Sequence, residues 1–176
     1  MSSNTFMTSN ADAQQTHSNH AILQNAMTIN GWTFFHHPCF DAQFTALIDK
    51  VEALRLKHPE SFQNKRASKV LYAIHKVITE RIAVNPAAAD FMQGHTLGKG
   101  HQHWCRAKFL QQYRLFFRFD RQAKIVILAW VNDDITLRAY DQKSDAYAVF
   151  GSMLRNGNPP DDWRELLLQA TNVTKK

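Results

Sequence analysis

Residues 104–131 alternate between apolar and polar side chains, and this pattern limits the possible folds more than any other feature of the chain. From Trp104 to Leu110 the odd positions are apolar and two even positions are basic, and Tyr113 to Phe119 repeats the pattern with two arginines. Ile125 to Val131 is apolar at every position, as is typical of a strand buried on both faces. We therefore expect a sheet with one cationic face, built from an amphipathic hairpin and a central strand.

The register of this hairpin is limited by parity. The apolar faces of its strands coincide only if paired residue numbers add to an even number, because a slip of one residue turns one strand over. One such register sets Arg106 opposite Arg118, and another sets Lys108 opposite Arg114. Either register brings two cations within roughly 5 Å, which destabilises a sheet that holds no anion. We therefore expect these four side chains to bind phosphate groups.

The charge balance and the aromatic residues of this region favour a nucleic acid as the anion. The formal net charge is +6, and residues 99–143 hold nine Lys and Arg against four Asp and Glu. Phe116 and Trp130 fall on the same face as the cations, where we expect them to stack on unpaired RNA bases. The alternative is the solvated face of an ordinary amphipathic hairpin.

The other segments complete a single domain of the α+β class. Residues 1–28 are rich in Ser, Asn, Gln and Thr, so they are predicted to form a disordered tail before a domain of residues 29–176. A short strand at 31–37 precedes a helical hairpin at about 41–57 and 61–85, and two more helices close the chain. The predicted order is β-α-α-β-β-β-α-α, with the helices packed on one face of the sheet.

Membrane and secreted classes are not expected. The longest apolar run, 125–131, is far shorter than the roughly 18 residues of a membrane-spanning helix. The N-terminal residues lack the basic and apolar runs of a signal peptide, and two cysteines are too few for a disulfide framework. We expect a protein of the reducing cytoplasm that makes no contact with a membrane.

Histidine, cysteine and acidic residues near the hairpin offer further chemistry. His101 and His103 could act as acid, base or metal ligands, but no third ligand pattern accompanies them, so neither a metal nor a cofactor is expected. Cys105 falls on the apolar face, which favours the core over a nucleophile. Asp133 and Asp134 follow the central strand, where turn formation or helix capping is the expected role.

Several motifs, in order along the chain, resemble the YhaV family of PrlF–YhaV toxin-antitoxin systems. The likeness covers about residues 29–165 and lies in Asn30-Gly31-Trp32, Pro38-Cys39-Phe40, Tyr113-Arg114-Leu115-Phe116-Phe117-Arg118, Trp130-Val131-Asn132-Asp133, Thr136-Leu137-Arg138-Ala139-Tyr140, Lys143 and Asp145-Ala146-Tyr147. This family belongs to the RelE-like toxins, small α+β ribonucleases that block translation. A cognate antitoxin holds them inactive.

The resemblance implies an endoribonuclease toxin that cleaves RNA without a metal ion. It also implies a PrlF-like antitoxin of the swapped-hairpin type, an RNA substrate that is free or on the ribosome, and contact with operator DNA only through the antitoxin complex. Two alternatives stay open. One is an RNA-binding inhibitor of translation that does not cleave, and the other is a toxin directed at gyrase or another protein.

The resemblance also suggests roles for individual residues. RelE-like enzymes use basic residues on the second and third strands, which gives Arg106, Lys108 and Arg114 as catalytic candidates. A C-terminal basic residue is matched by Arg138 or Lys143 and a tyrosine by Tyr140 or Tyr147, of which Arg138 and Tyr147 are taken as catalytic candidates. Attack by a 2′-hydroxyl needs a base, cations around the phosphorane and an acid, and Lys108, a tyrosine or a histidine could be the base. The predicted RNA-binding residues are Arg118, Phe116, Trp130, Asn132, Tyr140, Lys143 and His103.

Overall fold

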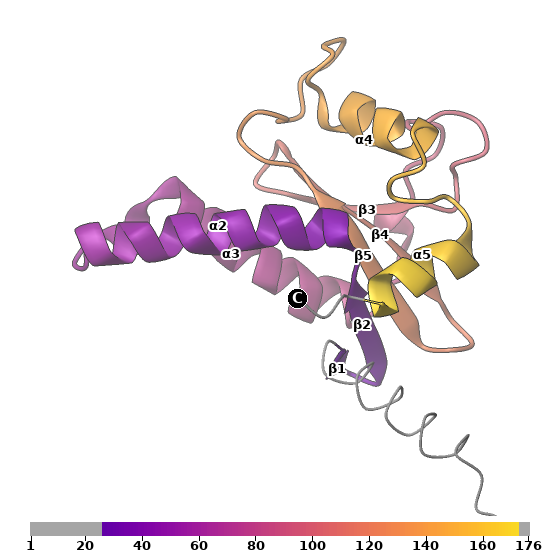
Figure 1. The fold of residues 1–176 in the computed structure, drawn as a ribbon, viewed down its shortest axis with the longest axis horizontal. Coiled ribbons are helices and arrows are strands. Elements are labelled where there is room, and N and C mark those ends of the chain that lie inside the picture. Colours follow the sequence, from indigo (N-terminus) through magenta and orange to yellow (C-terminus); the bar gives the residue numbers. More distant parts are fainter. Residues whose placement is uncertain (1–25, 173–176) are drawn as a thin grey trace, which may run out of the picture.

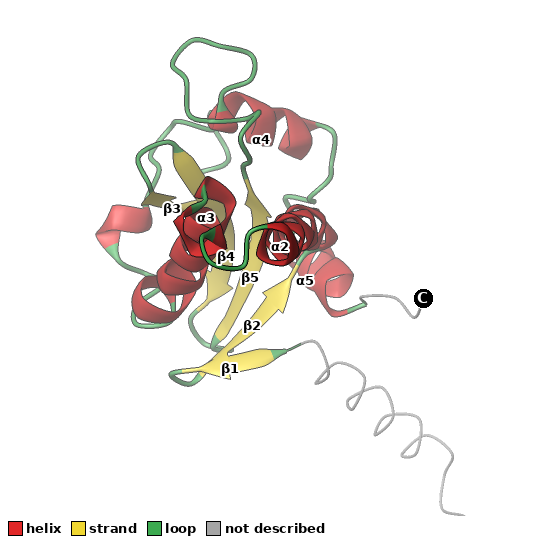
Figure 2. Ribbon diagram, turned by 90° about the vertical axis from the view of Figure 1, so that its left-hand side faces the viewer, coloured by secondary structure: helices red, strands yellow, loops and turns green. Residues whose placement is uncertain are grey.

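A computed structural model describes residues 26–172, which form one mixed five-stranded sheet with helices on both faces (Figures 1 and 2). The sheet order is β1-β2-β5-β4-β3, in which β2 and β5 run parallel and the other neighbours run antiparallel. The apolar β5 lies at the centre, as predicted. The strands are β1 (Met27–Ile29), β2 (Trp32–His36), β3 (Cys105–Phe109), β4 (Tyr113–Asp120) and β5 (Ile125–Val131).

The strand β1 corrects the predicted boundary of the tail. Met27 and Thr28, expected in the tail, form a short strand with Ile29 that pairs with β2. Three residues are too few to show a period of two, so only their pairing with β2 identifies them as a strand. The rest of the predicted tail, residues 1–25, lies outside the described residues.

The hairpin of β3 and β4 adopts one of the two predicted registers. Lys108 pairs with Arg114, and Arg106 pairs with Phe116. The alternative pairing of Arg106 with Arg118 does not occur. The turn is tight enough to place Leu110 and Gln111 in the left-handed region, with φ of 42° and 64°.

The helical hairpin covers the apolar face of the sheet. It consists of α2 (Pro38–Lys57) and α3 (Arg66–Lys76), and α3 continues as a π-helical segment (Val77–Ile82). The helix α2 begins before the predicted Asp41, because His37 caps it by accepting the Cys39 N–H and Pro38 suits the first helical position. Odd-numbered residues of the β3–β4 hairpin pack beneath these helices: Cys105, Ala107, Phe109, Tyr113, Leu115 and Phe117.

The C-terminal helices cover the opposite face, which corrects the prediction that all helices share one face. They are α4 (Ala146–Arg155) and α5 (Trp163–Thr171). Their apolar stripes form a second core with even-numbered strand residues, in which Phe116 and Trp130 pack against Phe150. Each helix pair buries its apolar stripe against strand residues, odd-numbered on one face of the hairpin and even-numbered on the other, so both faces are covered.

The structure also bears on the predictions for Cys105 and for membrane-spanning helices. Cys105 is buried in the first core, and burial raises the pKa of its thiol to about 11, which suits a core residue and not a nucleophile. Among residues 26–172, no helix is both long and apolar enough to cross a membrane.

Candidate active site

Two arginines from neighbouring strands meet at one tyrosine hydroxyl. Arg106 Nε on β3 donates to the Tyr147 hydroxyl over 2.8 Å, and Arg114 Nε on β4 donates to the same oxygen over 3.2 Å. Tyr147 lies in the first turn of α4, and its ring is nearly perpendicular to that of Phe116, with the centroids 5.6 Å apart. A hydroxyl that accepts two hydrogen bonds still has its own proton to donate. The sheet and α4 together thus create one polar centre.

Backbone carbonyls fix both guanidinium groups. Arg106 Nη1 donates to the carbonyl of Asp90 over 2.6 Å, and Arg114 Nη1 donates to the carbonyls of Gln111 and Tyr113 over 2.7 and 2.8 Å. The Nη2 group of each arginine takes part in none of these bonds, so it can donate to a ligand. The centre therefore has donors held in fixed positions.

Both arginines of this centre are buried. Only 8% of Arg106 and 6% of Arg114 is exposed, yet within residues 26–172 no carboxylate lies within ion-pair distance of either guanidinium. Buried charges in proteins are normally paired, because removal of a charge from water is costly. The centre therefore has an excess of positive charge that an anionic ligand would balance.

A third arginine is held beside this centre by an acidic residue. Arg138 Nη1 forms a short ion pair with Asp145, whose carboxylate also accepts the N–H groups of Ala139 and Tyr147 over 2.8 and 3.0 Å. The Arg138 guanidinium lies 3.8 Å from the ring centroid of Tyr140 and 4.9 Å from that of Tyr147. Asp145 thus caps α4 and fixes Arg138 relative to Tyr147.

Asp145 was not among the site residues predicted from the sequence. An aspartate directly before an amphipathic helix is a recognisable N-cap signal. That signal would have identified the cap of α4, but it would not have revealed the ion pair with Arg138.

Three other predicted residues are exposed, and two of them adjoin residues of this centre. Lys108 stands opposite Arg114 in the register of β3 and β4, with its side chain in solvent. Tyr140 is 77% exposed, and its ring carries the Arg138 guanidinium on one face. Lys143 is exposed in the loop before α4.

A hollow of about 520 Å³ opens beside Tyr147 and Arg138. Residues 96–98, the loop around Tyr140 and the exposed face of α4 enclose it, and Arg155 contributes a further guanidinium. Arg155 and residues 96–98 were not among the site residues predicted from the sequence. No local signal identifies them, because three distant segments form the hollow.

The structure contradicts three predicted RNA contacts. Phe116 and Trp130 are 0% and 4% exposed, and the Phe116 ring stacks on Phe150 of α4 with centroids 4.2 Å apart, so neither ring can receive a base. Asn132 is 3% exposed, and its amide has protein partners on both sides. Its oxygen accepts the Arg114 N–H over 2.6 Å, and its nitrogen donates to the carbonyls of Gln112 and Thr136.

Arg118 and His103 lie away from the arginine–tyrosine centre. Arg118 is four residues beyond Arg114 on β4, roughly 13 Å at the usual rise per residue. Its guanidinium is stacked between Trp104 and Trp163, with 5.5 and 5.3 Å to the ring centroids, and burial lowers its pKa below the ordinary value. His103 bonds to Asp161 over 2.9 Å. The structure therefore separates these two residues from the centre.

The two aspartates after β5 form a turn and an ionic network, as expected for structural residues. Asp133 accepts the N–H groups of Ile135 and Thr136, both over 3.0 Å, which stabilises the turn. Asp134 accepts the Tyr113 hydroxyl proton and also contacts Lys50 and Arg66. The bond from Tyr113 is the main reason why the pKa of Asp134 is lowered. Burial raises the pKa of Tyr113.

The chain is similar in sequence to known toxins. Residues 34–171 match the YhaV toxin family, described as toxins with endonuclease activity of toxin-antitoxin systems. The chain is 49% identical over 148 residues to the ribonuclease toxin YhaV of Escherichia coli K12, covering 83% of this chain and 96% of that protein. It is 49% identical over 140 residues to the toxin YhaV of Escherichia coli O6:H1, covering 78% and 91%. No solved structure matches the chain.

Proposed function

The chain belongs to the YhaV family of toxins with endonuclease activity, and we propose that its RNA-cleaving site is the centre formed by Arg106, Arg114, Arg138 and Tyr147. One observation carries this proposal: Arg106 and Arg114 are buried side by side without a carboxylate among the described residues. A phosphodiester would supply the negative charge, and guanidinium groups bind phosphate oxygens through paired N–H donors.

In the proposed reaction the RNA supplies its own nucleophile, so no metal ion is needed. The 2′-hydroxyl loses its proton to a base, its oxygen forms a bond to the adjacent phosphorus, and the bond from phosphorus to the 5′-oxygen breaks. The 5′-oxygen takes a proton from an acid. The products are a 2′,3′-cyclic phosphate and a 5′-hydroxyl. Arg106 and Arg114 stabilise the charge that gathers on the phosphorane oxygens.

Lys108 and Tyr147 are the groups proposed to move protons. The Tyr147 hydroxyl receives both guanidinium donors, so its own proton can point toward the leaving oxygen. Lys108 stands exposed beside Arg114, at the edge from which a ribose would approach. Tyr140 and Lys143 are proposed to hold the flanking nucleotides, Tyr140 by stacking and Lys143 by its charge.

Cleavage of a defined RNA tests this proposal. We expect the purified protein to cut single-stranded RNA equally well with and without EDTA, leaving 2′,3′-cyclic phosphate ends. We expect Arg114→Ala to lose cutting while retaining the thermal unfolding transition of a folded protein. RNA with a 2′-O-methyl group at the cut site should bind but stay intact.

Other results would contradict the proposal in specific ways. Cleavage that requires a divalent ion, or 3′-hydroxyl ends, would exclude attack by the 2′-hydroxyl. Unchanged cleavage by Arg114→Ala would place the site elsewhere. A gel shift without any cutting would favour a non-cleaving RNA-binding inhibitor, which the endonuclease activity of the family does not favour.

An antitoxin is the protein partner of such a toxin, and we propose a PrlF-like antitoxin that covers the arginine–tyrosine centre. We also propose that the toxin acts in the cytoplasm on free or ribosome-bound RNA and reaches operator DNA only through the antitoxin complex. Protection of the Tyr147 region in hydrogen exchange, together with loss of RNA binding, would support masking of the site.

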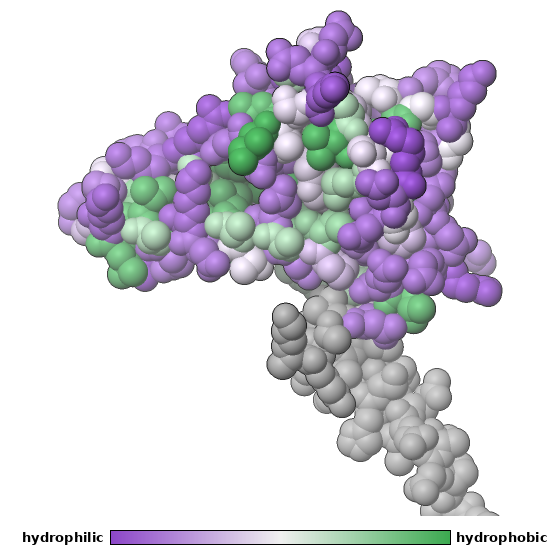
Figure 3. Space-filling view, turned by 45° about the horizontal axis from the view of Figure 1, so that its top comes forward, coloured by the Kyte–Doolittle hydropathy of each residue, from purple (hydrophilic) through white to green (hydrophobic). Residues whose placement is uncertain are grey.

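A different docking surface is the helical hairpin, where hydrophobic side chains reach the surface (Figure 3). An antitoxin bound only there, with the centre open to RNA, would contradict masking.

A further inference from the structure

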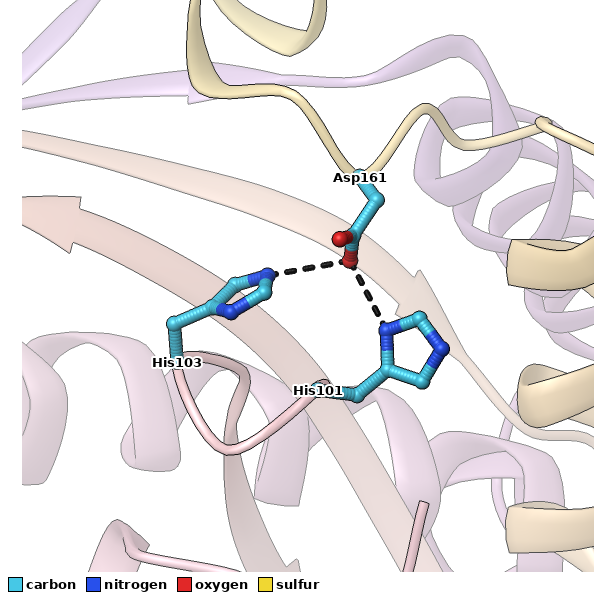
Figure 4. Close-up of side chains that lie close together, drawn as sticks. All are labelled: His101, His103 and Asp161. Atoms are coloured by element: carbon cyan, nitrogen blue, oxygen red, sulfur yellow. Dashed lines mark hydrogen bonds and ion pairs between the residues drawn. The ribbon is translucent and has the colours of Figure 1, made fainter. Parts of the chain in front are cut away.

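His101, His103 and Asp161 bring three metal-ligand side chains together at a place that the proposed reaction does not use (Figure 4). The two histidines precede β3, and Asp161 precedes α5, so the group joins segments that are far apart in the chain. His101 Nδ1 and His103 Nε2 lie 3.0 and 2.9 Å from the same oxygen, Asp161 Oδ1. All three ligand atoms lie within 4.8 Å of one another.

We propose that these three side chains bind one Zn²⁺ ion. Two imidazole nitrogens and one carboxylate oxygen are a common zinc ligand set, with water at the fourth tetrahedral position. Bonds of about 2.0–2.2 Å place tetrahedral ligand atoms about 3.3 Å apart. The two nitrogen–oxygen distances are already close to this value, and the two nitrogens, which lie within 4.8 Å of each other, would approach to the same separation around the ion. Imidazole ligands favour zinc over magnesium and calcium.

Neighbouring residues already hold the carboxylate in position. Trp104 Nε1 donates to Asp161 Oδ1 over 2.7 Å, and Arg118 Nη1 donates to the Asp161 backbone carbonyl over 2.6 Å. Outer hydrogen bonds of this kind orient the ligands of zinc sites and raise their affinity. The side chains of His101, His103 and Asp161 are 22%, 37% and 39% exposed, so an ion and its water can reach them.

The proposed ion would act as a clamp and not as a catalyst. It would tie the segment before β3 to the segment before α5. An ion bound only by the folded chain stabilises that chain. The inference does not depend on the cleavage mechanism, because the two sites share no residue.

Metal titration of the untagged, full-length protein after dialysis against EDTA tests the inference. We expect one Zn²⁺ per chain by calorimetry, and a visible absorption band of tetrahedral geometry with Co²⁺. Saturating Zn²⁺ should raise the melting temperature by about 4 °C or more. His103→Ala should weaken binding at least tenfold, whereas His75→Ala, which changes an exposed histidine of α3, should bind as the unchanged protein does.

Variants that keep the fold make the test decisive. His101→Gln and His103→Gln retain the bonds that Trp104 and Arg118 make to Asp161, so their circular dichroism in EDTA should match that of the unchanged protein. Absence of a stoichiometric ion would overturn the inference, as would full binding by the double histidine variant. RNA cleavage by these variants should continue in EDTA, which separates failure of the clamp from failure of the proposed nuclease.

Discussion

The two ends of the cationic sheet face have different roles although the same alternation of residues produces both. At one end Arg106 and Arg114 are buried around the Tyr147 hydroxyl, and no carboxylate of residues 26–172 pairs with either. At the other end Arg118 is stacked between two indole rings and bonded to the Asp161 carbonyl. An arginine on a predicted face is thus available to a ligand only if the covering elements leave its donors free. The following predictions test this difference.

The largest effect is expected from a change of Phe116, which lies between Arg114 and Arg118 on β4. Phe116→Ala removes a ring that is fully buried between the sheet and α4, so we expect a loss of about 3–5 kcal/mol in the free energy of unfolding. Urea denaturation measures it. The matched variant Phe119→Ala, which changes a half-buried ring on the same strand, should lose clearly less. A stable Phe116→Ala protein with weakened RNA binding would instead restore the base-stacking role.

The next largest effect distinguishes the two ends by activity. Arg106→Ala removes a positioned donor from the proposed phosphate site, so we expect kcat/KM for RNA cleavage to fall about a hundred- to a thousandfold. Arg118→Ala should change kcat/KM of the folded protein by less than about threefold, because its donors face Asp161 and the indole rings. Equal losses in the two variants would show that both ends of the face act on RNA.

A smaller effect is expected from the hydroxyl that joins the two arginines. Tyr147→Phe keeps the ring against Phe116 but removes the acceptor of both Nε–H groups. We expect a ten- to a hundredfold fall in kcat, since hydrogen bonds to charged groups contribute about 1.5–3 kcal/mol. Single-turnover kinetics on a short RNA measures it. A change in KM alone would make Tyr147 a binding residue and not a proton donor.

The strands β3, β4 and β5 were predictable because the order of apolar and polar residues within each strand shows which of its faces are buried. Alternation in β3 and β4 and the apolar β5 are local patterns, and parity reduced the register to two choices, of which the structure adopts the one that pairs Lys108 with Arg114. The strand β1 was not predictable, because its three residues become a strand only by pairing with β2.

The candidate site was predictable in its residue types but not in its boundaries. Phe116 and Trp130 were expected to be open to RNA because strand alternation says which face a side chain is on, and not what covers that face. The stripe of Tyr147, Phe150 and Leu154 on α4 needed an apolar partner, and these two rings are that partner. The bond from Trp104 to Asp161 spans 57 residues, a separation over which no local pattern carries information.

The smallest effect is expected from the ionic network of Asp134, which lies on the opposite face of the sheet. This network serves as a control for general effects of charge. The Tyr113 hydroxyl is the main cause of the lowered pKa of Asp134, with Lys50 and Arg66 adding to it. A carboxylate whose pKa is lowered by folding stabilises the folded protein at any pH above its pKa in the unfolded chain, which is near 3.9. This contribution is lost as the pH falls through the pKa of the folded state. Because half of the Asp134 side chain is exposed, the contribution should be below about 1 kcal/mol.

Asp134→Asn should therefore be slightly less stable than the unchanged protein at pH 7 and equally stable once the pH is below the folded pKa of Asp134. Urea denaturation at both pH values measures the difference, with Asp49→Asn on the exposed side of α2 as the control. Cleavage at pH 7 should be unchanged in both variants, because neither aspartate contacts Arg106, Arg114 or Tyr147. A stability gap that persists in acid would mean that Asp134 acts through packing or its neutral hydrogen bond. A loss of cleavage would mean that charge on either face of the sheet affects RNA, so that the buried Arg106 and Arg114 would no longer be the distinguishing feature of the site.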